Sequence, residues 1–431
     1  MKKLLYITLG LIVFNIFSCS YYTNRYLTYT SANRKINRHV LKNKLIFITE
    51  DYAQANNICL QLWVKIGDCN RSEELGVAHL LEHLLFDDIK KEWIEEFGEE
   101  PGSFNSKIDA FTSRDFTYYE ISTPRRYLIK SLDILSKSFT NLSITENNVI
   151  LEKKHVIKEL EIRNSDPFAL LWKNFAEVFF DRQPYYAKDI IGNNRDDVLN
   201  ISLENLRQYY KDYYTSNNVI LTVIGDNLTE YRIIEQIQQK FGGIASGNIN
   251  DRGIQKFQIQ TGRKEKTTSS SFENIYFAIG WDITGIDNND VYALEVVIPF
   301  ITKNGVQGGY LYHRQGGTIA FYSETGDNYS SGERLEKNIL DNLKNLLEKD
   351  ISQQELQKAK DVLLDNYNDN HKTASGRAYA LSLAECIGDI TYDIEYISRI
   401  KRVMTNDLKR GIAKYLKDDN YTVVILKPIE K

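Results

Sequence analysis

The alternation of apolar and polar positions predicts a series of strands and amphipathic helices along the first half of the chain. Apolar runs typical of strands occur at 45–48, 58–66, 115–121 and 218–224. Helical patterns occur at 75–86, 126–140, 146–163 and 167–180. This part of the chain is therefore expected to form a sheet that is covered by several long helices.

One stretch of this pattern occurs twice. The segment SLENLRQYYKDYYTSNNVILTV at 202–223 aligns with MTNDLKRGIAKYLKDDNYTVVIL at 404–426, with an offset of 202 residues. Both copies read as a polar helix start, an amphipathic helix and a buried strand. A constant offset through helix, turn and strand predicts two homologous α+β domains, each a mainly antiparallel sheet packed by helices.

The domain boundaries follow from composition. A linker rich in Gly, Ser, Lys and Gln is predicted at 242–270, between domains at 35–241 and 271–431. The chain of 431 residues is long enough for two or three domains. Its 42% apolar and 26% charged residues exclude a disordered or multi-span membrane protein. The formal charge of −4 gives no support to a nucleic-acid partner.

The N-terminus is typical of an export signal. Lys2 and Lys3 precede an apolar run at 4–17, and the run ends at Ser18-Cys19. Residues 1–19 are interpreted as a lipoprotein-type signal peptide that leaves Cys19 for lipid attachment, with an ordinary secretory signal as the alternative. Residues 20–34 are expected to form a tether. This predicts a protein of the bacterial cell envelope that is anchored to a membrane through an N-terminal lipid.

The strongest chemical signal is the sequence His79-Leu80-Leu81-Glu82-His83 in an apolar helical stretch. Residues i and i+4 share one face of a helix, so His79 and His83 can bind one metal ion. Glu82 falls on the flank of that face, where a general base for a metal-bound water is needed. The structural alternative is a pair of core histidines that bond to backbone carbonyls.

A zinc ion that acts in catalysis needs a third protein ligand from elsewhere in the chain. The predicted helix at 149–163 is the best source, because Glu152, His155 and Glu159 lie on one stripe of it. One carboxylate is expected to bind the metal and the other to support the site. Alternatively, both form surface salt bridges. A di-iron site is disfavoured because a second Glu-x-x-His is missing.

The order H-x-x-E-H is the signature of inverzincins. The segments GVAHLLEHLLF, DAFTSRDFTYYEIS, EKKHVIKELEIRNSDP and QPYYAKDIIG together resemble the pitrilysin/insulinase family of zinc metallopeptidases, and most closely its bacterial branch similar to mitochondrial processing peptidase. The resemblance implies one Zn²⁺ per chain, held by His79, His83 and Glu159. It also implies a zinc-dependent endopeptidase with Glu82 as general base and Glu152 as the second catalytic carboxylate.

The resemblance also suggests substrate contacts. Asp109 and Ala110 lie in a stretch to which the family adds the substrate backbone as a strand, although Asp109 stands where the family has Asn. Arg314 and Tyr322 in LYHRQGGTIAFYS are the nearest match to the Arg and Tyr that hold the substrate carbonyl. His155 is not typical of the family and is expected to be a packing or solvated residue, or an additional ligand.

The family encloses peptides between four such domains, and this chain supplies two. The resemblance therefore implies a homodimer, or a heterodimer with a sister subunit, that acts on peptides. The alternative function is a non-catalytic or partner-dependent subunit of a processing-peptidase-like assembly.

Overall fold

The computed structural model describes residues 23–31, 34–68, 75–249, 261–314, 316–326 and 331–429. The predicted signal peptide and Cys19 lie outside these residues. Within them, no helix combines the length and the apolar character that are needed to cross a membrane.

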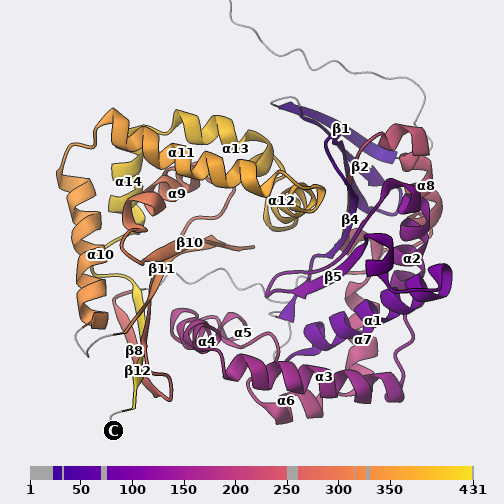
Figure 1. Cartoon of the computed structure of the whole chain (residues 1–431), viewed down its shortest axis with the longest axis horizontal. Coiled ribbons are helices and arrows are strands. Elements are labelled where there is room, and N and C mark those ends of the chain that lie inside the picture. The colour runs from indigo at the N-terminus through magenta and orange to yellow at the C-terminus, as the bar shows by residue number, and fades with distance from the viewer. Residues whose placement is uncertain are drawn as a thin grey trace, which may run out of the picture.

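The first domain is built on a sheet of seven strands (Figure 1). In spatial order these are β1 (Thr23–Ser31), β2 (Arg34–Leu41), β3 (Ile46–Asp51), β7 (Val219–Gly225), β4 (Ile58–Val64), β6 (Thr117–Thr123) and β5 (Lys107–Thr112). All neighbours are antiparallel except β3 and β7, which are parallel. The prediction of a tether at 20–34 is corrected here, because most of that segment forms β1 and pairs with β2.

The second domain has a sheet of five strands with the same arrangement. Its order is β8 (Lys264–Ser270), β12 (Thr422–Pro428), β9 (Ile275–Ile283), β11 (Gly316–Thr325) and β10 (Gln307–His313). This matches β3-β7-β4-β6-β5 strand for strand, including the single parallel pair, β8 with β12. The predicted α+β fold with two homologous domains is confirmed. The last residues of the predicted linker at 242–270 belong to β8.

The inner strands β2, β3, β4 and β7 of the first sheet each face two different cores, as the period of two along a strand requires. In β4, Leu60 and Leu62 pack under the outer helices, whereas Cys59 and Trp63 face the second domain. The outer helices are α1 (Val77–Phe97), α2 (Leu128–Asn141), α3 (Glu146–Asn164), α7 (Leu203–Tyr213) and α8 (Ile233–Phe241). The short helices α5 (Pro184–Ala187) and α6 (Arg195–Asn200) follow α4 in the chain.

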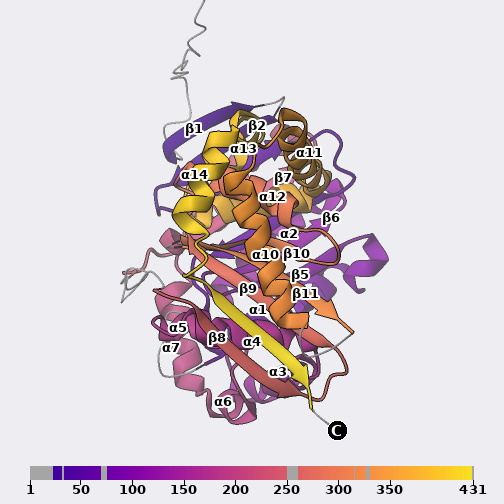
Figure 2. The same ribbon diagram turned by 90° about the vertical axis from the view of Figure 1, so that its left-hand side faces the viewer.

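In the second domain, α9 (Asp290–Ile301) packs against α10 (Ser331–Glu348), α11 (Gln353–Asn370), α13 (Thr391–Arg402) and α14 (Thr405–Tyr415). The repeat that was predicted from the sequence corresponds to α7 followed by β7 and to α14 followed by β12. Helices α10 and α14 both contact β9, and Figure 2 shows them beside the second sheet.

The two domains exchange one helix each. Helix α4 (Pro167–Phe179) belongs to the first half of the chain but packs on β12, β9 and β8 of the second sheet. Helix α12 (Ala374–Ile387) belongs to the second half but packs on β4 and β7 of the first sheet. Figure 1 shows α12 reaching toward β4 and α4 lying beside β8 and β12. This exchange joins the two domains, because each sheet is covered by a helix from the other half of the chain.

Candidate metal centre

Helix α1 begins in a tightly fixed way. Gly76 has φ +80°, and a Cβ there would lie 2.5 Å from the carbonyl oxygen of Ile191, so only glycine fits this helix start. The Asp68 carboxylate accepts hydrogen bonds from the backbone N–H of Gly76 at 3.0 Å and of Ala78 at 3.4 Å. Burial raises the pKa of Asp68 to about 8. Asp68 thus fixes the turn that carries His79, a role that the sequence did not reveal.

The structure brings the three predicted metal ligands together. The Nε2 atoms of His79 and His83 lie 3.5 Å and 3.4 Å from Oε2 of Glu159. One ligand atom from each of the three residues falls within a span of 4.8 Å. Ligand atoms about 2.1 Å from a tetrahedral zinc ion are roughly 3.4 Å apart. The donor set and its spacing therefore fit a zinc ion with one open position.

The protonation of the two histidines differs. Burial lowers the pKa of His79 to about 4, so this imidazole is neutral, as a metal ligand must be. Burial also disfavours the charged form of His83, but hydrogen bonds with Glu152 and Glu159 outweigh it and raise its pKa to about 9. A metal ion that binds here must therefore displace a proton from His83.

Glu152 contacts a ligand rather than joining the ligand set. Its Oε2 lies 3.3 Å from Nδ1 of His83 and 3.0 Å from Nδ1 of His155. This arrangement favours the His83 tautomer that carries its proton on Nδ1 and leaves Nε2 for the metal. His155 is largely exposed and contacts Glu152. Glu152 is thus placed as a positioning residue for His83.

Glu82 lies on α1 one residue before His83 and is only 8% exposed. Burial raises its pKa to about 7, partly offset by the Thr112 hydroxyl. Its Oε2 is buried and has no hydrogen-bond partner among the described residues. An unpaired buried carboxylate oxygen is costly unless a ligand or water uses it. This is the arrangement expected of a general base.

Strand β5, which carries Asp109 and Ala110, forms one edge of the first sheet. Within the described residues its only ladder partner is β6, and it packs beside α1. Asp109 pairs with Nζ of Lys107 at 2.5 Å, and its Oδ1 accepts from the backbone N–H of Ala110 at 3.1 Å. The outer edge of β5 is the place where an extended peptide can add a strand.

The two residues predicted to hold the substrate carbonyl have other contacts. The Arg314 guanidinium donates to the carbonyl of Lys65 at 2.6 Å and so ties the β10–β11 turn to the end of β4. The Tyr322 ring packs edge-on against Phe168 and Trp172 of α4. These contacts give Arg314 and Tyr322 a role in joining the domains.

A cleft of about 620 Å³ is walled by both domains. It begins at Phe111 of β5 and Arg163 of α3, and it extends to Lys173 of α4 and His313 of β10. None of these four residues was singled out from the sequence. Their positions depend on the packing of α4 and β10 across the domain boundary, which no local pattern encodes.

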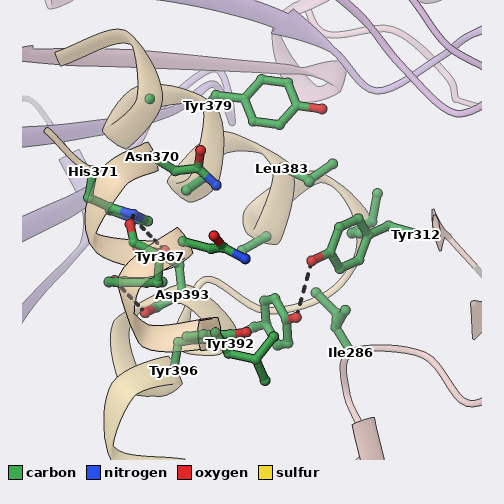
Figure 3. Close-up of a pocket in the computed structure, with 16 residues that line it drawn as sticks. Ile286, Tyr312, Tyr367, Asn370, His371, Tyr379, Leu383, Tyr392, Asp393 and Tyr396 are labelled. Carbon is green, nitrogen blue, oxygen red and sulfur yellow. Dashed lines mark hydrogen bonds and ion pairs between the residues drawn. The ribbon is translucent and has the colours of Figure 1, made fainter. Parts of the chain in front are cut away.

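A second pocket of about 390 Å³ lies between α11, α12 and α13 (Figure 3). Tyrosines form much of its wall, and the hydroxyls of Tyr312, Tyr367, Tyr392 and Tyr396 bond to partners within the protein. The hydroxyls of Tyr312 and Tyr392 lie 3.3 Å apart, and Asp393 bonds to Nε2 of His371 at 2.8 Å. Arg34 also pairs with Asp393 at 3.0 Å. The charges at this pocket are therefore already neutralised within the protein.

Comparison with known proteins matches two models of one family to this chain. Residues 46–188 match the family model described as insulinase (peptidase family M16), and residues 200–363 match the peptidase M16 inactive domain. The chain is 24% identical to the zinc protease PqqE of Helicobacter pylori, over 84% of this chain and 86% of the relative. It is also 24% identical to subunit 1 of the Caenorhabditis elegans cytochrome b-c1 complex, over 61% of this chain and 55% of that protein.

Solved structures show the same architecture. A protease from Helicobacter pylori superimposes with a TM-score of 0.82 at 22% identity, and the match covers 92% of this chain and all of that one. The H-x-x-E-H helix falls within the first family model, whereas the second model begins at α7 of the first domain and ends within α11 of the second. The chain belongs to the insulinase (M16) family of peptidases.

Proposed function

We propose that this protein is a zinc-dependent endopeptidase that binds one Zn²⁺ per chain and hydrolyses peptides or unfolded segments. The single observation that carries the proposal is the meeting of His79, His83 and Glu159 beside the buried Glu82, whose Oε2 has no partner among the described residues. The name of the PqqE relative supports the same metal and reaction.

In this mechanism the peptide adds to the free edge of β5, which places its backbone beside α1. Zinc, when bound, lowers the pKa of a water molecule and polarises the scissile carbonyl. Glu82 takes a proton from that water and later gives it to the leaving nitrogen. Glu152 holds the His83 ring in place throughout.

The decisive experiment compares peptide hydrolysis by the wild type and by Glu82→Gln. The substitution keeps the size of the side chain but removes the base, so kcat should fall by about 10³-fold or more, while zinc content and melting temperature stay close to wild type. Zinc content is measured by elemental analysis, and hydrolysis is measured with internally quenched peptides. Equal rates for the two proteins would dispose of the proposed mechanism.

The second domain offers a matched control. Glu295 on α9 is another glutamate that is buried in a helix, and it lies away from the metal ligands, where it bonds to Tyr392 and Tyr396. Glu295→Gln makes the same chemical change and should leave kcat within about twofold of wild type. A similar loss in both variants would mean that Glu82 acts through folding rather than chemistry.

A second candidate function is a non-catalytic or partner-dependent subunit. It is favoured by the match to an inactive-domain model and by the relative that is a subunit of the cytochrome b-c1 complex. A wild-type protein that holds zinc but cleaves no peptide by itself would support this function. Light scattering would then test for a homodimer, and co-purification would test for a sister chain.

The location of the protein is part of the proposal. The N-terminal residues 1–19 have the pattern of a lipoprotein signal, so we propose an exported protein anchored through Cys19 to a bacterial envelope membrane. Cys19→Ser should release the protein into the soluble fraction. A variant that stays in the membrane fraction would contradict the anchor without affecting the enzymatic proposal.

A further inference from the structure

The cleft that both domains wall lies directly beside the candidate metal ligands. Arg163 follows Glu159 by one helical turn and acts electrostatically on both Glu159 and His79. Phe111, which also lines the cleft, follows Ala110 on the edge strand β5. A peptide that lies on β5 across the metal must therefore present its neighbouring side chains to this cleft.

Charge is unevenly distributed in the cleft. Its lining includes Arg114, Arg163 and Lys173 but only two carboxylates, Asp115 and Asp189. Both carboxylates have internal partners. Asp189 pairs with Arg163 at 3.3 Å and accepts from the backbone N–H of Ile191. Asp115 accepts from the Tyr186 hydroxyl and from the backbone N–H of Arg314.

Lys173 is the cation that this arrangement leaves uncompensated. Its side chain projects from α4, the helix that packs on the second sheet, and is partly buried. Its Nζ donates to the backbone carbonyl of Asn193 at 3.2 Å, and no carboxylate pairs with it within the described part of the chain. A partly desolvated ammonium with only a neutral acceptor attracts a carboxylate more strongly than an exposed lysine does.

The walls around Lys173 are aromatic. Trp172 and Phe175 come from α4, Phe180 follows that helix, and Tyr310 and Tyr312 come from β10. These rings provide a surface for a bulky apolar group and lower the local polarity, which strengthens the attraction between Lys173 and an acid. The cleft thus combines an apolar wall with the positive charge of Lys173, with which no carboxylate of the described residues pairs.

We propose that this cleft selects peptides that carry an acidic side chain next to a bulky apolar one near the cleaved bond, and that Lys173 binds the acid. The proposal rests on the proposed endopeptidase function, whose substrate class it names. A peptide with Lys in place of the acid would bring two ammonium groups together and is rejected.

Hydrolysis of matched peptides tests the preference. A set of internally quenched peptides carries Glu, Gln or Lys at one position at a time on either side of the scissile bond. At one position, wild type should cleave the Glu peptide with a kcat/KM about tenfold or more above that of the Lys peptide. Lys173→Met should abolish this difference, and Lys173→Glu should reverse it.

The control is Lys154→Glu. Lys154 is exposed on α3 and makes no pair within the described residues, so this substitution changes the net charge by the same amount away from the cleft. It should keep the wild-type preference. If Lys154→Glu and Lys173→Glu shift the preference equally, the effect comes from the overall charge and the proposal is overturned.

A binding measurement separates this proposal from the catalytic one. Of the four tryptophans, Trp63, Trp93 and Trp281 are fully buried, whereas Trp172 is partly exposed in the cleft. Tryptophan fluorescence of the Glu82→Gln protein should therefore report the binding of a tryptophan-free Glu peptide, with a Kd about tenfold below that of its Lys counterpart.

The outcomes are distinct. Selective binding of the Glu peptide without hydrolysis by wild type would overturn the proposed function but support the cleft as a site for acidic peptides. Efficient hydrolysis with equal kcat/KM for Glu, Gln and Lys peptides at every position would support the function and overturn the role of Lys173.

Discussion

Helix α1 of the first domain and helix α9 of the second occupy equivalent places, because each follows the central strand β4 or β9 and precedes the edge strand β5 or β10. Counted from its first residue, each helix has a buried glutamate at its sixth position, Glu82 or Glu295. The third and seventh residues are His79 and His83 in α1.

In α9 these two positions are held by Tyr292 and Val296. Burial raises the pKa of both glutamates to about 7, so burial affects the two carboxyl groups to a similar extent. What differs is the set of groups that faces the carboxylate. Glu295 accepts hydrogen bonds from the Tyr392 and Tyr396 hydroxyls, whereas Oε2 of Glu82 has no partner among the described residues. The two glutamates therefore differ in the hydrogen bonds that their carboxylates accept, and not in how deeply they are buried.

A double substitution that places histidines at the third and seventh residues of α9 tests this difference between the two helices. In the variant Tyr292→His/Val296→His, helix α9 carries the H-x-x-E-H order, but the Tyr392 and Tyr396 hydroxyls of α13 already occupy the Glu295 carboxylate. Both new imidazoles replace buried side chains and find no designed partner. We expect an unfolding free energy lower by on the order of 4 kcal/mol and no second zinc ion. Urea unfolding and elemental analysis measure the two quantities.

Two zinc ions per chain in that variant would contradict this comparison, because the second domain would then already possess a complete ligand environment. The corresponding removal, His79→Ala in the first domain, is the matched control. It should lower the zinc content from one per chain to near zero while the second domain remains folded.

A smaller effect is expected from the charge of Glu295. Its pKa is about 7 in the folded protein and near 4.5 in the unfolded chain, so the folded state holds the proton longer. Stability from this group is therefore complete below pH 4.5 and is lost as the pH rises through 7. Glu295→Gln mimics the protonated form. Relative to wild type, it should gain on the order of 2 kcal/mol in unfolding free energy between pH 4.5 and pH 7.5.

Urea unfolding at a series of pH values gives this difference directly, because other titrating groups are common to both proteins. A constant difference between wild type and Glu295→Gln across this range would show that Glu295 is ionised in the folded state and that the tyrosine hydroxyls compensate its burial completely.

The sequence predicts those features that local patterns encode. The H-x-x-E-H spacing places His79 and His83 on one face of a helix, and the pattern shared by α7–β7 and α14–β12 shows the repeat. Glu159 is distant from the histidines in sequence. The pattern of its helix offers both Glu152 and Glu159 as the third ligand, and only the family resemblance distinguishes them. The equivalence of α1 and α9 is not visible in the sequence because α9 has Tyr292 and Val296 where α1 has histidines, so it is the shared order of strands and helices that shows it.

Other features depend on tertiary packing. The apolar face of α4 predicts a buried helix but not that its partner is the second sheet, so Lys173 could not be placed in a cleft beside the metal ligands. Strand β1 has a weak pattern, TNRYLTYTS, and forms because β2 supplies its ladder partner. Whether such a segment forms an edge strand depends on the neighbouring strand as well as on its own sequence, so the pattern of β1 alone did not predict it.

The smallest expected effect comes from the hydrogen bond between Tyr396 and Glu295. Tyr396→Phe keeps the ring but removes the hydroxyl that donates to Oε2 of Glu295 at 2.6 Å. The loss should cost about 1 kcal/mol at pH 5, where Glu295 is neutral, and about 2 kcal/mol at pH 8, where the lost bond goes to a charged acceptor. Tyr379→Phe is the control, because its hydroxyl makes no hydrogen bond within the described residues and its ring lines the same pocket. A Tyr396→Phe cost that does not grow with pH would mean that Glu295 keeps one protonation state between pH 5 and pH 8, which would contradict a pKa of about 7.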